Sequence, residues 1–177
     1  MSGHSKWSKV KHQKATTDVA RGAAFTKASR AITVAVREGG TDANSNFHLR
    51  LAIEQARAVN MPKETIQRAI EKGSGPAGEG GIERVVYGAY GPGGVALLIE
   101  AVTDNRNRTV SVIKNTLERF GGSLVSPGAV AFLFTRSGIT MKPLVVMELP
   151  QDKRATIETL VAQLTALEDV QRVYTNI

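Results

Sequence analysis

The chain has 177 residues, of which 42% are hydrophobic and 22% charged, and it contains no cysteine. This composition is typical of a globular protein of one or two domains, and it excludes a disulfide framework, a thiol nucleophile and every cysteine-based metal site. Residues 1–37 hold eight of the 23 basic and one of the 16 acidic side chains, so they carry the whole net charge of +7. A basic segment on a neutral body favours a polyanionic partner, most often nucleic acid. The alternatives are a solvated tail and a mitochondrial presequence.

No apolar run in the sequence approaches the ~18 residues of a membrane-spanning helix. The N-terminal residues also lack the apolar core of a secretory signal. We therefore expect a cytoplasmic protein that does not bind membranes.

The first predicted helix follows a polar N-terminal arm. Residues 1–15 show little apolar periodicity and are expected to be flexible. Thr17 or Asp18 can cap a helix that runs to about Glu38 and ends at Gly39-Gly40. Apolar side chains recur along one face of this helix at helical spacing. They are Phe25, Ala28, Ile32, Ala35 and Val36.

Two shorter helices complete the expected N-terminal domain. The first covers about residues 44–59, with Phe47 among the side chains that face inward. Pro62 suits the first position of the second, which Gly73 closes. The basic arm and the three helices together form the predicted domain of residues 1–72.

A glycine-rich segment, residues 73–81, is predicted to be a linker. Within it, Gly73, Gly75 and Gly78 match the G-x-G-x-x-G spacing of dinucleotide-binding loops. Such a loop needs a strand before it and a helix directly after it, and neither is expected here. The pattern therefore predicts no nucleotide cofactor.

The periodicity changes to that of strands after the linker, so residues 82–177 are predicted to form an α+β domain. Without its first strand, the order is β-α-β-β-α-β, a split β-α-β (ferredoxin-like) antiparallel sheet with two helices. The fold class of the chain is therefore α and α+β. The predicted strands are 82–90, 95–103, 129–136, 144–149 and 170–175, and the predicted helices are 105–120 and 152–167.

The basic N-terminal segment is the first candidate nucleic-acid-binding surface. Its charged side chains can hold phosphates, and the indole of Trp7 can stack on an unpaired base. The alternative for Trp7 is a buried anchor that fixes the arm. Lys27, Arg30 and Arg37 fall on the helix face opposite the apolar stripe. The candidate residues are Lys6, Trp7, Lys9, Lys11, His12, Lys14, Arg21, Lys27, Arg30 and Arg37.

The second candidate is the corner at which the strand 95–103 leads into the next helix. A dense set of hydrogen-bond donors lies there beside a helix N-terminus, where anions bind well. The alternative is local, with Asp104 or Asn105 as the helix cap and the arginines paired with nearby carboxylates. The candidate residues are Asn105, Arg106, Asn107 and Arg108.

The sequence offers no catalytic or metal-binding arrangement. His4 and His12 lie in the arm and His48 lies in the helical domain, so no Ser/His/Asp set can be proposed. Glu100 and Asp104 could pair for acid–base chemistry, but Asp104 is better placed as a helix cap. We expect no enzyme activity, metal, cofactor or small-molecule substrate.

Seven strings of residues, in order over nearly the whole chain, carry a family resemblance. They are 1–7 (MSGHSKW), 11–14 (KHQK), 25–27 (FTK), 60–63 (NMPK), 90–94 (YGPGG), 103–109 (TDNRNRT) and 169–176 (DVQRVYTN). With them the chain resembles the YebC/PmpR family. The resemblance implies a DNA-binding transcriptional regulator, and it argues against a presequence because mature bacterial members begin in this way. Relatives that include the mitochondrial translational activator of cytochrome c oxidase imply an alternative, a translation factor that binds ribosomal RNA or tRNA on the ribosome.

One departure from the family pattern concerns a third domain, which fuller members insert after the strand that matches 129–136. Here residues 137–140 run straight into 141–143, so the insertion expected near 137–141 is absent. The resemblance therefore implies a short form in which the cleft between domains is reduced or missing. We expect a monomer or a weak oligomer.

Overall fold

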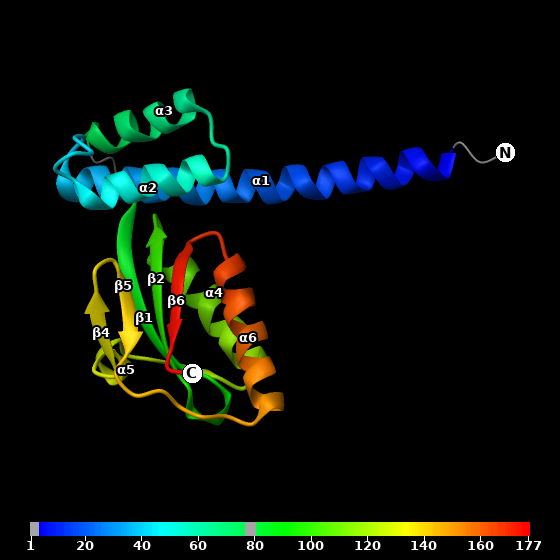
Figure 1. Cartoon of the computed structure of the whole chain (residues 1–177), viewed down its shortest axis with the longest axis vertical. Coiled ribbons are helices and arrows are strands. Elements are labelled where there is room, and N and C mark those ends of the chain that lie inside the picture. The colour runs from blue at the N-terminus through cyan, green and yellow to red at the C-terminus, as the bar shows by residue number, and fades with distance from the viewer. Residues whose placement is uncertain (1–3, 77–80) are drawn as a thin grey trace. The chain divides into compact units, whose positions relative to one another are not determined.

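The computed structural model describes residues 4–76 and 81–177, with side chains from residue 17 onward within these ranges (Figure 1). The chain divides into two compact units, Met1–Gly75 and Pro76–Ile177. The first unit is helical, and the second is an antiparallel sheet covered by helices. The predicted fold class, α followed by α+β, is confirmed.

Three helices form the first unit: α1 (His4–Gly39), α2 (Phe47–Ala58) and α3 (Lys63–Ser74). Helix α1 begins at His4, so the prediction of a flexible arm before Thr17 is wrong for residues 4–15. The physical reason is that no glycine or proline interrupts residues 4–21, and lysine, glutamine and alanine in this stretch favour the helix. Residues 1–3 lie outside the described part.

The core of the first unit is built from small and medium apolar side chains. On α1 the predicted stripe is buried at Ile32, Ala35 and Val36. The prediction that Phe47 faces inward is wrong, because this side chain is 50% exposed at the start of α2 and stacks with the guanidinium of Arg50. The buried positions of α2 are Leu49, Ala52 and Ala56, which share one helix face.

Asn46 fixes the turn between α1 and α2 and is itself buried. Its side-chain oxygen accepts a hydrogen bond from the backbone N–H of Leu49 at 3.0 Å, which caps α2. Its side-chain nitrogen donates to the backbone oxygens of Ala35 at 2.7 Å and Gly40 at 2.8 Å. One amide thereby satisfies backbone groups at the end of one helix and the start of the next.

A close approach of α3 to α1 depends on Gly73. A Cβ atom at this position would lie 2.7 Å from Cβ of Val36 and 2.9 Å from the backbone oxygen of Thr33. Gly73 is therefore a packing residue in the last turn of α3. Gly78, the third glycine of the G-x-G-x-x-G pattern, lies outside the described residues.

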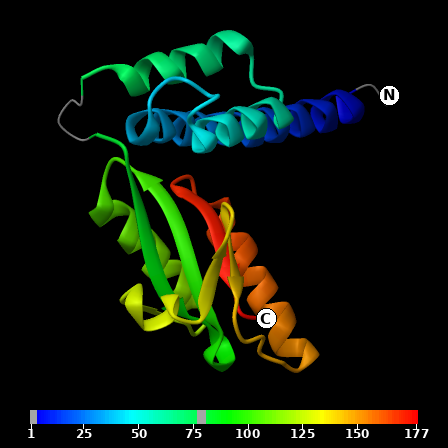
Figure 2. The ribbon, with the colours of Figure 1, turned by 60° about the vertical axis from the view of Figure 1, so that its left-hand side comes forward.

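The second unit contains a four-stranded antiparallel sheet of order β3-β1-β2-β6 and a separate two-stranded sheet, β4-β5. Figure 2 shows the strands and the helices beside them from a second direction. The elements are β1 (Glu83–Tyr90), the 3-10 helix η1 (Pro92–Gly94), β2 (Ala96–Thr103), α4 (Arg106–Arg119), β3 (Ser123–Val125), α5 (Gly128–Ala131), β4 (Phe134–Ser137), β5 (Thr140–Pro143), α6 (Gln151–Ala166) and β6 (Val170–Thr175).

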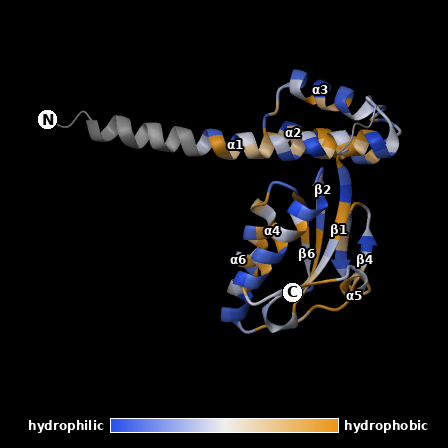
Figure 3. Cartoon of the chain, turned by 180° about the vertical axis from the view of Figure 1, so that it is seen from behind, coloured by the Kyte–Doolittle hydropathy of each residue, from blue (hydrophilic) through white to orange (hydrophobic). Residues whose placement is uncertain are grey.

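The two faces of the four-stranded sheet are covered by different elements. Helices α4 and α6 cover one face, where Ile99 of β2 packs with Ile113 and Leu160. Helix α5 and the β4-β5 hairpin cover the other face, where Leu98 packs with Phe134. Because β2 is buried on both sides, it is apolar along most of its length. Figure 3 shows hydrophobic residues along β1, β2 and α1.

The strands after α4 differ from the prediction. The predicted strand 129–136 is divided between α5 and β4, because Pro127 has helical backbone angles and starts a short turn. The predicted strand 144–149 is irregular and is held by two backbone bonds, from Leu144 N–H to Leu133 and from Met147 N–H to Asn176. The first strand, β1, lies inside the sheet, so the β-α-β-β-α-β order that omits it is not the observed one.

Strands β4 and β5 are joined by a two-residue turn. Ser137 pairs with Thr140, and Gly138 between them has a φ of 63°, a conformation that favours glycine. The chain thus closes a tight hairpin at the position where the resemblance predicts a missing insertion.

Candidate nucleic-acid interface

The N-terminal candidates belong to one continuous helix. Six of them, Lys6, Trp7, Lys9, Lys11, His12 and Lys14, lie in the first half of α1. Their side chains lie outside the described part of the structure, and so does the choice between a stacking and an anchoring role for Trp7.

The other four candidates on α1 have described side chains. Arg21 is exposed and donates a hydrogen bond to Asp18 at 3.0 Å. Lys27, Arg30 and Arg37 are half-buried, although the sequence placed them opposite the apolar stripe. The part of α1 around Arg21 is the more accessible one, because residues 17–23 are all exposed and together cover every side of the helix.

The second candidate surface, the corner between β2 and α4, is organised by Asn105. Its side chain accepts a hydrogen bond from the backbone N–H of Arg108 at 3.0 Å, so Asn105 is the N-cap of α4. Its own N–H donates to the hydroxyl of Thr103 at 2.9 Å. Of the two caps considered from the sequence, Asn105 is therefore the one observed.

Arg106 joins the start of α4 to the start of β1. Its Nε and Nη2 atoms donate to the two carboxylate oxygens of Glu83 at 2.5 and 2.6 Å. The hydrogen bond from Arg106 holds the pKa of Glu83 below its usual value, and the same contact raises the pKa of Arg106. Both side chains are largely exposed, at 63% and 45%, so water and salt weaken this pair.

Arg108 binds a carboxylate that is more deeply buried than Glu83. Its Nη2 atom donates to Asp104 at 2.6 Å and to Asp169 at 3.1 Å, and these bonds raise its pKa, with Asp104 as the larger cause. Asp169, just before β6, is only 8% exposed and also accepts from the hydroxyl of Thr109 at 2.6 Å. A buried carboxylate depends on such partners for its stability in the folded state.

Asn107 is exposed, and its backbone oxygen accepts the hydroxyl of Ser111 at 2.8 Å. The corner thus combines two arginines with three carboxylates, Glu83, Asp104 and Asp169, and the local pairing considered from the sequence is present. An incoming phosphate would compete with Glu83 for Arg106 in water, whereas Arg108 is committed to a buried carboxylate.

Sequence reasoning missed Glu83 and Asp169 as members of this corner. Thr109 and Asp169 lie in the strings TDNRNRT and DVQRVYTN, far apart in sequence, and only the folded sheet brings them together. Both strings carry the family resemblance, and this shared property is the signal in the sequence that could have indicated that they lie together.

Among residues 4–76 and 81–177, no group of three or more histidine, aspartate or glutamate side chains is arranged to hold a metal ion. None of the helices in these ranges combines the length and the apolar character needed to cross a membrane.

Two family models match the chain: the TACO1/YebC protein N-terminal domain at residues 5–76, and the TACO1/YebC second and third domain at residues 82–141. The chain belongs to the TACO1/YebC family. This confirms the resemblance seen in the sequence.

Individual relatives agree with this assignment. A "probable transcriptional regulatory protein" of Chloroflexus aggregans is 53% identical over 155 residues, which are 87% of this chain and 60% of the relative. One of Hydrogenobaculum sp. is 42% identical over 99% of this chain and 71% of the relative. The crystal structure of a conserved hypothetical protein from Aquifex aeolicus matches with a TM-score of 0.79 and 31% identity, covering 88% of this chain and 89% of that one. The chain spans about 60% of the length of several curated relatives that it matches.

Proposed function

We propose that this protein is a non-enzymatic, nucleic-acid-binding regulator of gene expression, and specifically a cytoplasmic DNA-binding transcriptional regulator. The observation that carries the proposal is the position of the charge. The whole excess of +7 lies in residues 1–37, and all but the first few of these residues belong to α1. Relatives that are about half identical bear the name "probable transcriptional regulatory protein".

A helix is a suitable element for reading duplex DNA. The major groove of B-DNA admits an α-helix, whereas the major groove of duplex RNA is too deep and narrow for side-chain readout. The 36 residues of α1 extend over about 54 Å at 1.5 Å per residue. Because residues 17–23 are exposed on every side, this part of α1 is free to enter a groove.

The proposed contacts are the basic side chains of α1, with Trp7 and His12, and the corner residues Asn105, Arg106, Asn107 and Arg108. Within the corner we assign the phosphate contact to Arg106, because its bond to Glu83 is exposed. Arg108 acts mainly by holding Asp169 and thereby the shape of the corner.

A second candidate function is a translation factor that binds ribosomal RNA or tRNA. One observation favours it over a helix-turn-helix regulator. Helix α3 follows α2 after a short turn, as a recognition helix would, yet it carries Glu64 and Glu71 beside its three basic residues. A helix of such mixed charge is poorly suited to the phosphates that flank a DNA groove.

Two binding measurements on the full chain separate these functions. Fluorescence anisotropy with labelled duplex DNA should show binding at low salt, and ribosome co-sedimentation with and without ribonuclease tests the alternative. DNA binding without ribosome association supports the regulator. Ribosome association that ribonuclease abolishes, without binding to DNA, would replace it by the translation factor.

A further inference from the structure

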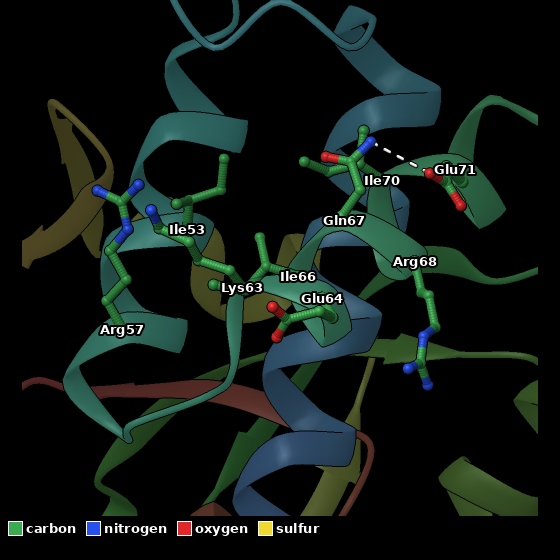
Figure 4. Close-up of a pocket in the computed structure, with 9 residues that line it drawn as sticks. All are labelled: Ile53, Arg57, Lys63, Glu64, Ile66, Gln67, Arg68, Ile70 and Glu71. Carbon is green, nitrogen blue, oxygen red and sulfur yellow. Dashed lines mark hydrogen bonds between the residues drawn. The ribbon is translucent and has the colours of Figure 1, made fainter.

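A groove between α2 and α3 lies in the first unit, and its lining shares no residue with either candidate nucleic-acid surface (Figure 4). It has a volume of about 580 Å³. That volume lies in the range of pockets that take a ligand or the side chains of a partner.

Three isoleucines form the apolar floor of the groove. Ile53 comes from α2, and Ile66 and Ile70 stand one helical turn apart on α3. Ile66 is buried, while Ile53 and Ile70 are half-buried and pack against the core of the unit. The same side chains therefore hold the two helices together and leave an apolar strip open between them.

Three cations stand on the rim of this floor. Arg57 at the end of α2 and Lys63 at the start of α3 lie near one another in Figure 4, and Arg68 lies further along α3. All three are exposed, and none forms an ion pair with another side chain of the described residues. Glu64 and Glu71 also line the groove, and Glu71 accepts a hydrogen bond from Gln67 at 3.2 Å. The cations thus outnumber the carboxylates.

The first turn of α3 adds to the preference for negative charge at one end of the groove. Pro62 stands at the cap position and provides no side-chain cap. Its backbone oxygen accepts the N–H groups of Thr65 and Ile66 at 3.0 and 3.1 Å, so the N–H groups that face solvent or a partner are those of Lys63 and Glu64. These groups and the helix dipole favour a carboxylate beside Lys63 and Arg57.

We propose that this groove docks an acidic amphipathic helix of a partner protein. An apolar strip between two helices takes the side chains that a third helix presents at positions i, i+3, i+4 and i+7, and the rim cations pair with acidic residues on its flanks. Nucleic acid fits less well, because the floor is aliphatic and offers no aromatic ring for a base to stack on. The inference goes beyond nucleic-acid binding: it gives the regulator a protein partner on a surface that α1 does not provide.

Two synthetic peptides test this docking against the full chain. The first is a fluorescein-labelled helix of about four turns, with leucine at the i, i+3, i+4 and i+7 positions and glutamate on both flanks. The second replaces every flanking glutamate by lysine. Fluorescence anisotropy should show micromolar binding of the acidic peptide and binding of the basic peptide that is about tenfold weaker or more.

A matched pair of double variants then locates the binding. Arg57→Glu with Arg68→Glu reverses two rim cations, and Arg50→Glu with Lys72→Glu reverses two exposed cations that do not line the groove. The two pairs change the net charge equally, so a general charge effect acts on both. We expect the rim pair to lower affinity for the acidic peptide by about tenfold or more, and the control pair by less than about threefold. Circular dichroism checks that both proteins remain folded.

Three outcomes would overturn the docking proposal. One is that the acidic peptide fails to bind, or binds no better than the basic peptide. Another is an equal effect of the rim and control pairs. The third is that the rim pair loses binding to a single-stranded oligonucleotide while its peptide affinity is unchanged, which would assign the groove to nucleic acid.

Discussion

Arg106 and Arg108 stand two residues apart on α4 but are held by carboxylates of very different exposure. Glu83, which binds Arg106, is 45% exposed at its side chain, whereas Asp169, which binds Arg108, is 10% exposed. Removing one partner of a buried charge leaves the other without compensation, while an exposed pair contributes little. Arg108 therefore contributes more to stability than Arg106, although both lie in the first turn of α4 and the sequence alone does not distinguish them.

We predict that Arg108→Ala lowers the free energy of unfolding by about 1–2 kcal/mol, since the buried carboxylate of Asp169 loses the guanidinium of Arg108. Arg106→Ala should change it much less, because water and salt weaken the exposed pair with Glu83. Urea denaturation of both variants gives the comparison. A loss for Arg106→Ala as large as that for Arg108→Ala would contradict the account of the corner.

Substitutions in the exposed pair of Arg106 and Glu83 should change the affinity for DNA in opposite directions. Arg106→Ala removes the proposed phosphate contact. It should weaken duplex binding several-fold and reduce the slope of log affinity against log salt concentration by about one. Glu83→Gln removes the competing carboxylate and should strengthen binding. Anisotropy at fixed salt gives the two affinities, and titrations at several salt concentrations give the slope. If the two variants bind as the parent does, the corner makes no contact with DNA.

At the scale of elements, the packing of α3 against α1 rests on the missing side chain of Gly73. We predict that Gly73→Ala lowers the free energy of unfolding by about 1–3 kcal/mol, because the added methyl group meets Val36 and the backbone of Thr33. Gly22→Ala is the matched control: apart from its chain neighbours and the adjacent backbone of α1, no described atom lies within 4 Å of the new methyl group, and the change should stabilise the helix by about 1 kcal/mol. Thermal or urea unfolding that is unchanged by Gly73→Ala would show that the helices adjust freely.

Helices and long strands could be predicted from the sequence where periodicity is strong, as in β1, β2, α4 and α6. Apolar periodicity did not predict the secondary structure of segments whose conformation depends on packing against other elements. Leu144, Val145 and Val146 have the composition of a strand but find no place in the four-stranded sheet and are exposed. The three residues of β3 are too few to show a pattern, and α1 continued through a polar stretch because nothing in that stretch ends a helix.

Removal of residues 1–15 tests whether the first part of α1 contributes to DNA binding and not to the stability of the fold. Among the described side chains of this helix, the buried positions begin at Ile32 and residues 17–23 are exposed, so the truncated chain should unfold at nearly the same temperature as the full chain. It loses Lys6, Lys9, Lys11 and Lys14, and its affinity for DNA should fall by orders of magnitude. A large drop in melting temperature would instead make the segment structural, with Trp7 as its anchor.

At the scale of the whole molecule, the excess of positive charge is confined to the N-terminal fifth of the chain. Residues 38–177 hold 15 basic and 15 acidic side chains, while the excess lies in α1. This distribution could be read from the sequence because it depends on composition alone. The pairing of Arg106 with Glu83 and of Arg108 with Asp169 could not, because it requires the register of β1 and β6 in the sheet.

The central claim, that the basic residues of α1 hold nucleic-acid phosphates, is tested most directly by the salt dependence of duplex binding. If about six phosphates are neutralised, the affinity of the full chain should fall ~10³-fold between 50 and 200 mM salt. Anisotropy titrations at several salt concentrations give the slope. The account predicts this steep decline, and an affinity that stays constant over the same range would show that the basic segment is not the contact surface.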